Sequence, residues 1–217
     1  MSKITSVEVQ KKNPHRFNIY LDGQFAFGAD EDLVVEYRLI KDKVIDQVLL
    51  DKLLFEAEVG KLMERMYALF NKRARSEKEI RDYFRIKNYE LRIKNKELIS
   101  DLVIEQVIKK LNQKSLLNDE EFAKAWVLSR SKKKSIQAVK SELYKKGIDK
   151  EIIEEAVGFQ SSAIRQNQTA EELLIKRLPR WQDLPYMDRK KKAFEFLLRR
   201  GFEYELVKEV VSGTLEK

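Results

Sequence analysis

The chain has 217 residues, of which 43% are hydrophobic and 37% charged, a balance typical of a folded protein rich in helix. It has no cysteine and a single histidine, His15, so disulfide frameworks, thiol nucleophiles, histidine-rich zinc sites and serine hydrolase triads are not expected. No apolar run reaches membrane length and the first ten residues lack a signal core, so we expect a cytoplasmic protein with no membrane partner.

The net charge of +8 is unevenly distributed along the chain. Residues 1–60 contain 8 basic and 11 acidic side chains, whereas residues 61–217 contain 36 and 25. The positive charge therefore belongs to the later part of the chain. Such a field favours nucleic acid, or an acidic protein surface, as the partner.

Residues 3–28 are the only stretch with the alternating pattern of β-strands. Polar and apolar residues alternate on both sides of Asn13-Pro14, and Asp22-Gly23 is a strong hairpin-turn signal. We therefore predict a three-stranded meander. The acidic run at residues 30–32 is typical of a helix start, and a long amphipathic helix is predicted from about Ile45 to Asn71.

After the long helix, one pattern of helix, stop and helix occurs three times. The predicted stops are Asn88, Gly147 and Gly201, residues that tolerate a left-handed backbone, and an additional helix precedes each copy. We predict a mainly α fold of three tandem three-helix repeats in an elongated, curved stack, behind the small β-meander and its helix. The predicted domains are residues 1–45, 46–113, 114–158 and 159–217.

Three pairs of residues have the spacing of a helix capping box, in which a small polar residue is followed three residues later by Glu. These pairs are Ser76 with Glu79, Asn118 with Glu121, and Thr169 with Glu172. Asp188 is predicted to cap the middle helix of the third repeat. Both tryptophans, Trp126 and Trp181, are predicted to anchor the core.

Basic residues recur on the middle helix of every repeat, whereas the last helices of the second and third repeats are rich in Glu. A recognition helix of the helix-turn-helix type would therefore bring carboxylates against phosphates, which disfavours sequence-specific reading of DNA by those helices. The middle helices remain candidates for contact with phosphates or with an acidic protein groove.

Three segments resemble motifs of the RecX family, the regulators of the bacterial recombinase RecA. They are KRARSEKEIRDYF (72–84), SLLNDEEFAKAWVLSR (115–130) and ELYKKGIDKEIIEEA (142–156). Ser135 and Asn88 depart from the family pattern, which usually has Gly at both positions. The matching positions are Arg73, Arg75, Asn118, Asp119, Phe122 and Lys146.

The resemblance implies a monomeric, non-catalytic inhibitor that binds in the groove of the RecA filament on single-stranded DNA and affects DNA repair, recombination and the SOS response. Double-stranded DNA is a further candidate partner. No cofactor is expected, because the chain has no phosphate-binding loop of the G-x-x-x-x-G-K-S/T type. The predicted contact residues for RecA and DNA are Arg73, Arg75, Arg81, Arg130, Lys132, Lys133, Lys134, Lys140, Lys145, Lys146, Arg189, Lys190, Arg199 and Arg200.

Two alternatives stay open at this point. The protein could act mainly as a general nucleic-acid-binding protein, with the recombinase contact secondary. It could also be an enzyme on nucleic acid that holds a divalent metal at Asp119, Glu120 and Glu121, although their place at a helix start favours a capping role.

Overall fold

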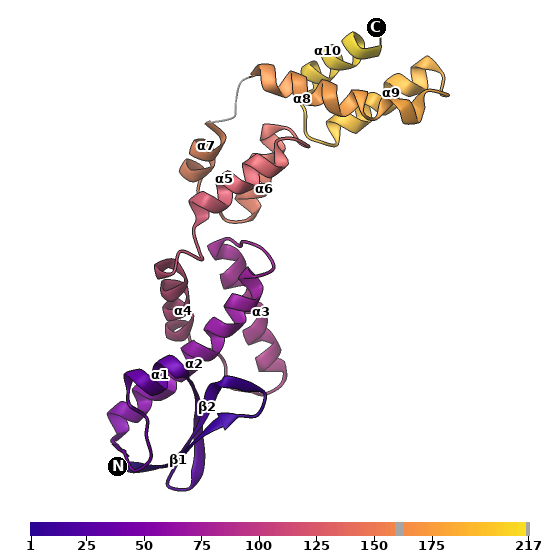
Figure 1. The fold of residues 1–217 in the computed structure, drawn as a ribbon. Helices are drawn as coiled ribbons and strands as arrows, with labels where there is room; N and C mark the ends of the chain where they lie inside the picture. The colour runs from indigo at the N-terminus through magenta and orange to yellow at the C-terminus, as the bar shows by residue number, and fades with distance from the viewer. Residues whose placement is uncertain (159–162, 216–217) are drawn as a thin grey trace. The chain divides into compact units, whose positions relative to one another are not determined.

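The computed structural model describes residues 1–158 and 163–215, and within these residues it contains ten α-helices, a short 3-10 helix and four β-strands (Figure 1). The helices form three-helix groups and the strands form an N-terminal sheet, which confirms the predicted mainly α fold with a β-meander. Contacts divide the chain into two units. The first comprises Met1–Ala74 and Ile80–Leu117, and the second comprises Arg75–Glu79 and Asn118–Lys217.

In the first unit, the meander consists of β1 (Ser2–Gln10), β2 (Asn13–Leu21) and β3 (Gln24–Asp30), each antiparallel to the next. The predicted hairpin turn is present, with Asp22 and Gly23 both at positive φ, 49° and 83°. A fourth strand, β4 (Val44–Ile45), pairs with the start of β1 and makes the sheet order β3-β2-β1-β4. Two residues are too few to show an alternating pattern, so β4 was not predicted.

Two helices cover this sheet, α1 (Glu31–Glu36) and the long α2 (Gln47–Phe70), which matches the predicted amphipathic helix. The Asp30 carboxylate accepts a hydrogen bond from the Leu33 amide at 2.9 Å, so the acidic run starts a helix as predicted. The core between sheet and helices is aliphatic and aromatic. Its buried residues include Ile4, Ile19, Phe27, Leu33, Leu39 and Leu53.

The first helical repeat contains the end of α2 together with α3 (Glu77–Ile93) and α4 (Asp101–Gln113). The prediction that Asn88 ends the middle helix is wrong, because α3 continues to Ile93 and the left-handed residue is Asn95, at φ 49°. The Asn88 amide instead donates to the Ile99 carbonyl at 2.8 Å and accepts from the Ile99 amide at 2.9 Å. It therefore holds the segment that leads into α4.

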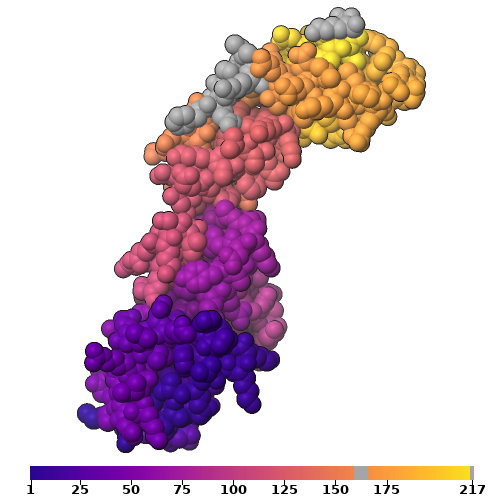
Figure 2. All heavy atoms as spheres, viewed as in Figure 1, coloured from indigo at the N-terminus to yellow at the C-terminus, as the bar shows by residue number. Residues whose placement is uncertain are grey.

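The second unit contains the other two repeats, each with its own core. The second repeat is α5 (Asp119–Arg130), α6 (Ile136–Lys145) and α7 (Lys150–Gly158). The third is α8 (Ala163–Ile175), the 3-10 helix η1 (Leu178–Trp181), α9 (Tyr186–Leu198) and α10 (Tyr204–Leu215), and Figure 2 shows these elements closed into one packed body. Gly147 and Gly201 adopt φ of 78° and 81°, which confirms both as left-handed helix stops.

Of the four predicted helix caps, the structure confirms two and contradicts two. Ser76 and Glu79 form a reciprocal capping box with two 3.3 Å hydrogen bonds, and Asn118 accepts from the Glu121 amide at 3.0 Å. Thr169 does not cap a helix, because it lies inside α8. Asp188 is also not a cap, because α9 begins after Pro185, which has no amide hydrogen to satisfy, and Asp188 lies in the first turn.

A junction of one design occurs twice in the second unit. Ser76, in the segment 75–79 that belongs to this unit, is fully buried and its hydroxyl donates to the Lys146 carbonyl at 2.7 Å. Ser135 is likewise buried; its amide donates to the Arg200 carbonyl at 3.1 Å and its hydroxyl to the Gly201 carbonyl. In both cases the capping serine of one middle helix satisfies carbonyls at the left-handed turn of the next.

No helix among residues 1–158 and 163–215 is long and apolar enough to cross a membrane.

Replacing Gly201 with Ala should destabilise the third repeat by about 1–3 kcal/mol, because a left-handed φ is strained for any residue with a Cβ. The new Cβ would also lie 2.8 Å from the Ala138 Cβ. Urea unfolding followed by circular dichroism measures the loss.

Gly213→Ala is the matched control, since this glycine lies in α10 with open space where a Cβ would be. It should be neutral or stabilising by up to about 1 kcal/mol. Equal effects of the two substitutions would show that the turn geometry does not matter.

Candidate interaction surface

Glu142 neutralises part of the basic run that follows α5. Its carboxylate, on α6, is paired with Lys134 and lies 3.6 Å from the Arg130 Nε, and it accepts a hydrogen bond from the Trp126 indole at 2.8 Å. Burial alone would raise the pKa of Glu142, but the hydrogen bonds from Lys134 and Trp126 and the charges of Lys134 and Arg130 outweigh it and lower the pKa. Two of the predicted contact residues are therefore engaged inside the repeat.

Three more predicted contact residues face carboxylates. Lys140 pairs with Glu154 of α7 at 2.6 Å, and Lys146 pairs with Glu79 at 2.9 Å. In the first unit, Arg81 pairs with Glu105. The partners of these cations are 14 to 67 positions away along the chain. Helical spacing rules compare only neighbours three or four residues apart, so they could not reveal these pairs.

Three of the predicted contact lysines of the second repeat are exposed, Lys132 and Lys133 in the turn after α5 and Lys145 at the end of α6. Among the residues that the structure describes, none of the three forms an ion pair. Their charge is open to solvent and to a partner. The structure thus divides the predicted basic set of this repeat into cations with carboxylate partners and cations without them.

Two of the cations that have carboxylate partners, Lys146 and Arg130, also lie over aromatic rings. Lys146 Nζ lies 4.4 Å from the Trp126 ring centroid and 5.6 Å from that of Phe122, and the Arg130 guanidinium carbon lies 4.7 Å from Trp126. Trp126 also stacks on Phe122 and packs against the core, and Trp181 is only 9% exposed. Both tryptophans anchor cores, as predicted.

The remaining predicted residues lie in the segment before α3 and in the third repeat. Arg73 is exposed and donates to the Ala74 carbonyl at 2.9 Å, while Arg75 is half-buried. In the third repeat, Lys190 lies 5.9 Å from the Tyr186 ring, Arg199 is exposed and Arg200 lies on the Phe196 ring. Arg189 is half-buried, and no hydrogen-bond partner within the described residues meets its Nε.

One of the acids proposed as a metal site, Asp119, has a structural partner. The Asp119 carboxylate accepts a hydrogen bond from the Glu77 amide at 3.0 Å, within the second unit. Burial raises the pKa of Asp119, the hydrogen bond from Glu77 opposes that rise, and the negative charges of Glu77, Asp149 and Glu79 add to it. Asp119 therefore stands beside other carboxylates and caps a backbone group.

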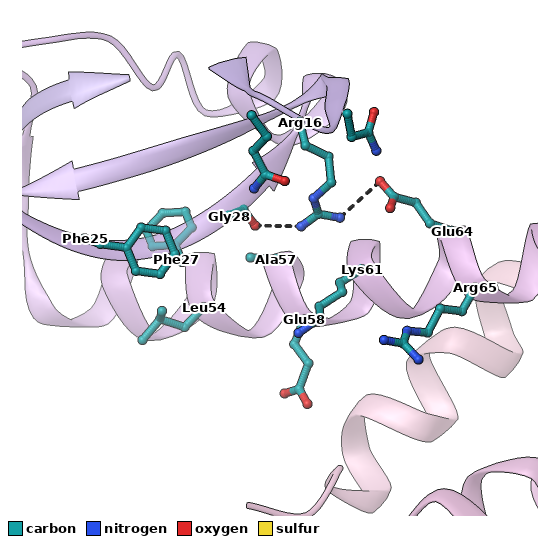
Figure 3. A pocket seen from close by; sticks show the side chains of 12 residues that line it. Arg16, Phe25, Phe27, Gly28, Leu54, Ala57, Glu58, Lys61, Glu64 and Arg65 are labelled. Carbon is teal, nitrogen blue, oxygen red and sulfur yellow. Dashed lines mark hydrogen bonds and ion pairs between the residues drawn. The ribbon is translucent and has the colours of Figure 1, made fainter. Parts of the chain in front are cut away.

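The first unit contains a cavity of about 620 Å³ between the sheet and α2 that the sequence did not indicate (Figure 3). Arg16 lies in its wall and is only 7% exposed; it donates to the Gly28 carbonyl at 2.9 Å and to the Glu64 carboxylate at 3.1 Å. Phe25 and Leu54, both exposed, line the cavity where the sheet meets the helix. Because both terminal nitrogens of this buried arginine donate to groups on the sheet and the helix, Arg16 holds the sheet to α2.

Replacing Glu142 with Gln should lower the free energy of unfolding at neutral pH by about 1 kcal/mol, because the ion pairs with Lys134 and Arg130 are lost. The lowered pKa of Glu142 means that its stabilisation is present above the ordinary glutamate pKa and is lost as the pH falls through the folded-state value. Chemical unfolding at a series of pH values should therefore show the two proteins converging in acid.

Glu155→Gln serves as the control, since Glu155 is exposed on α7 and has no ion pair within the described part of the chain. It should match the wild type at every pH. A constant gap between wild type and Glu142→Gln across the series would contradict the assignment.

Comparison with known proteins places this architecture in one family. Family models match three stretches of the chain: the regulatory protein RecX N-terminal domain at residues 2–46, the RecX second three-helix domain at 118–157, and the RecX third three-helix domain at 165–211. The regulatory protein RecX of Bacillus subtilis (strain 168) is 36% identical over 95% of this chain and 75% of its own length. That of Clostridium perfringens (strain 13 / Type A) is 29% identical over 97% and 95%.

Solved structures agree with the sequence relatives. A crystal structure of regulatory protein RecX covers 98% of this chain and 100% of its own, with a TM-score of 0.67 and 25% identity. A crystal structure of RecX from Lactobacillus salivarius covers 72% and 96%, with a TM-score of 0.55 and 24% identity, and supports the fold. Relatives above 30% identity over nearly the whole chain settle the family, and this chain belongs to the RecX family of regulatory proteins.

Proposed function

We propose that this chain is a non-catalytic regulator of the RecA recombinase, which binds in the groove of the RecA filament on single-stranded DNA and inhibits it. Membership of a family of regulatory proteins supports the regulatory role. The observation that carries the binding mode is the exposed set Lys132, Lys133 and Lys145 in the second repeat, which has no carboxylate partner in the described residues. Cations of this kind attract an acidic, DNA-filled groove and guide the encounter.

The distribution of acids supports contact through the turn after α5 and the end of α6 over contact through the last helices. Exposed glutamates lie on α7, at Glu151, Glu154 and Glu155, and on α10, at Glu205 and Glu209. Those two helices would repel phosphates, so a major-groove recognition helix is not part of this proposal. The chain would act by steric occlusion of the filament, with its lysines directing it there, and without nucleotide.

The decisive experiment is the rate of single-stranded-DNA-dependent ATP hydrolysis by RecA as this protein is added well below one copy per RecA protomer. We expect the rate to fall while free DNA remains accessible to a DNA-binding dye, since one inhibitor would act on the filament. A fall only when enough protein is present to cover the DNA would instead favour general nucleic-acid binding, the alternative that the same lysines support.

The double substitution Lys132→Ala and Lys133→Ala should weaken binding to RecA filaments about tenfold at moderate salt, because two unpaired charges are removed. The thermal unfolding midpoint should stay the same, since exposed lysines without ion pairs contribute little to stability. Filament co-sedimentation and thermal melting give the two readouts.

The matched control is Lys11→Ala with Lys12→Ala, an equally exposed lysine pair in the turn between β1 and β2. It changes the net charge by the same amount at a different place. If both double variants lose the same affinity, net charge alone explains binding and the lysines after α5 have no special role.

A further inference from the structure

The third repeat contains a group of arginines that share one aromatic ring. The guanidinium carbon of Arg200, in the turn after α9, lies 3.8 Å from the Phe196 ring centroid. The guanidinium carbon of Arg177, just after α8, lies 5.8 Å from the same centroid and 5.8 Å from that of Trp181. Arg199 adjoins Arg200 in the chain and is exposed. Arg177 was not among the residues predicted from the sequence.

No carboxylate balances these charges within the described residues. Arg200 donates to the Phe196 backbone carbonyl at 3.3 Å, and the Arg177 Nε is buried without a hydrogen-bond partner in the part of the chain that the structure describes. Burial lowers the pKa of Arg200, and the charges of Arg177 and Arg199 lower it further. Arginine stays protonated at any ordinary pH, so the repulsion among these groups is not relieved by loss of a proton.

In the second repeat, the cation that precedes the left-handed glycine has a carboxylate partner. Lys146 precedes the left-handed Gly147 as Arg200 precedes Gly201, and Lys146 also lies over core aromatics. Its charge is met by Glu79, three residues after the buried Ser76. Three residues after Ser135 the chain has Ala138, which has no carboxylate. The third repeat thus keeps the cation, and no carboxylate among its described residues forms an ion pair with it.

Packing alone does not account for this arrangement. One guanidinium on an aromatic face is a common favourable contact, but a second beside the same ring adds like-charge repulsion. Buried charges in proteins are as a rule paired, so a buried, unpartnered Nε next to a second guanidinium points to a ligand that would balance the two charges. The ligand that such a pair of cations attracts is an anion.

We propose that Arg177 and Arg200, with Arg199 beside them, form a phosphate-binding site for the backbone of single-stranded nucleic acid. Three guanidinium groups with no acid among them match a chain of phosphodiesters better than an acidic protein surface, which mixes both signs of charge. Phe196 is only 6% exposed and is covered by the arginines, so the site takes phosphates and leaves the bases unread. The inference rests on the proposed function only for its choice of nucleic acid, and its test contains no RecA.

The test measures binding of fluorescein-labelled oligothymidylate to the full chain by anisotropy at several salt concentrations. Arg177→Gln and Arg200→Gln should each weaken binding about five- to tenfold. Each should also reduce the slope of log affinity against log salt by about 0.7, the loss of one phosphate contact on a single strand. Arg180→Gln, an exposed arginine of η1 that contacts neither ring, is the matched control and should retain wild-type affinity and slope.

Two more arms separate the outcomes. Pyrophosphate should displace the labelled strand from the wild type more effectively than sodium chloride at equal ionic strength, and polyglutamate should displace it poorly. Equal displacement by polyglutamate, or variants that bind like Arg180→Gln, would overturn the proposal. Arg200→Lys keeps the charge, so it should fold even if the glutamine variants do not and should lose part of the affinity. Wild-type affinity in Arg200→Lys would also contradict the assignment.

Because RecA is absent, this site and the filament proposal fail separately. Loss of oligothymidylate binding in the arginine variants with intact inhibition of RecA would support the site and place inhibition elsewhere. Normal oligothymidylate binding in the variants would remove the site and leave the filament proposal untouched.

Discussion

The hydrogen bonds of two buried serines organise the second unit. Ser76 and Ser135 each cap the helix that they precede, and each also donates from the same hydroxyl to a carbonyl at a left-handed turn of the next middle helix. A hydroxyl can do both because it accepts and donates. Each turn also needs its glycine. A Cβ at Gly147 would clash with the Lys78 side chain, and one at Gly201 would clash with Ala138. Within the second unit, one small polar residue and one glycine thus leave the backbone groups of each turn satisfied.

Charge in this protein serves two purposes that the structure separates. Cations opposed by Glu142, Glu154, Glu79 or Glu105 hold helices together. The lysines after α5 and the arginines around Phe196 have no such partner in the described residues. A net charge of +8 gives no hint of this division, because paired and unpaired cations contribute equally to it. The proposed contacts with filament and nucleic acid follow from the unpaired ones.

The β unit of the first unit is held to α2 by an apolar core and by one buried cation, Arg16. This arginine spans from the Gly28 carbonyl to Glu64, so it connects β3 to the helix 48 positions further along the chain. Glu58, on the same helix and lining the same cavity, has its pKa raised, first by burial and then by the charge of Glu97. The apolar core and the Arg16 bridge hold the sheet against α2, which gives so small a sheet the packing partner that it needs.

The sequence by itself determined the elements whose signals are local. The hairpin at Asp22-Gly23, the cap at Asp30, the capping box at Ser76 and the glycine stops at 147 and 201 all depend on residues within a few positions of one another. The prediction that Asn88 ends a helix is wrong because α3 continues past it and its side-chain amide bonds to Ile99. The prediction that Thr169 is a cap is wrong because the capping-box spacing also occurs inside helices. Only the tertiary structure decided which cations are free, since each carboxylate partner comes from another helix. Likewise the pairing of Arg177 with Arg200 over Phe196 depends on how α8 and α9 pack, and no spacing along the chain encodes that contact.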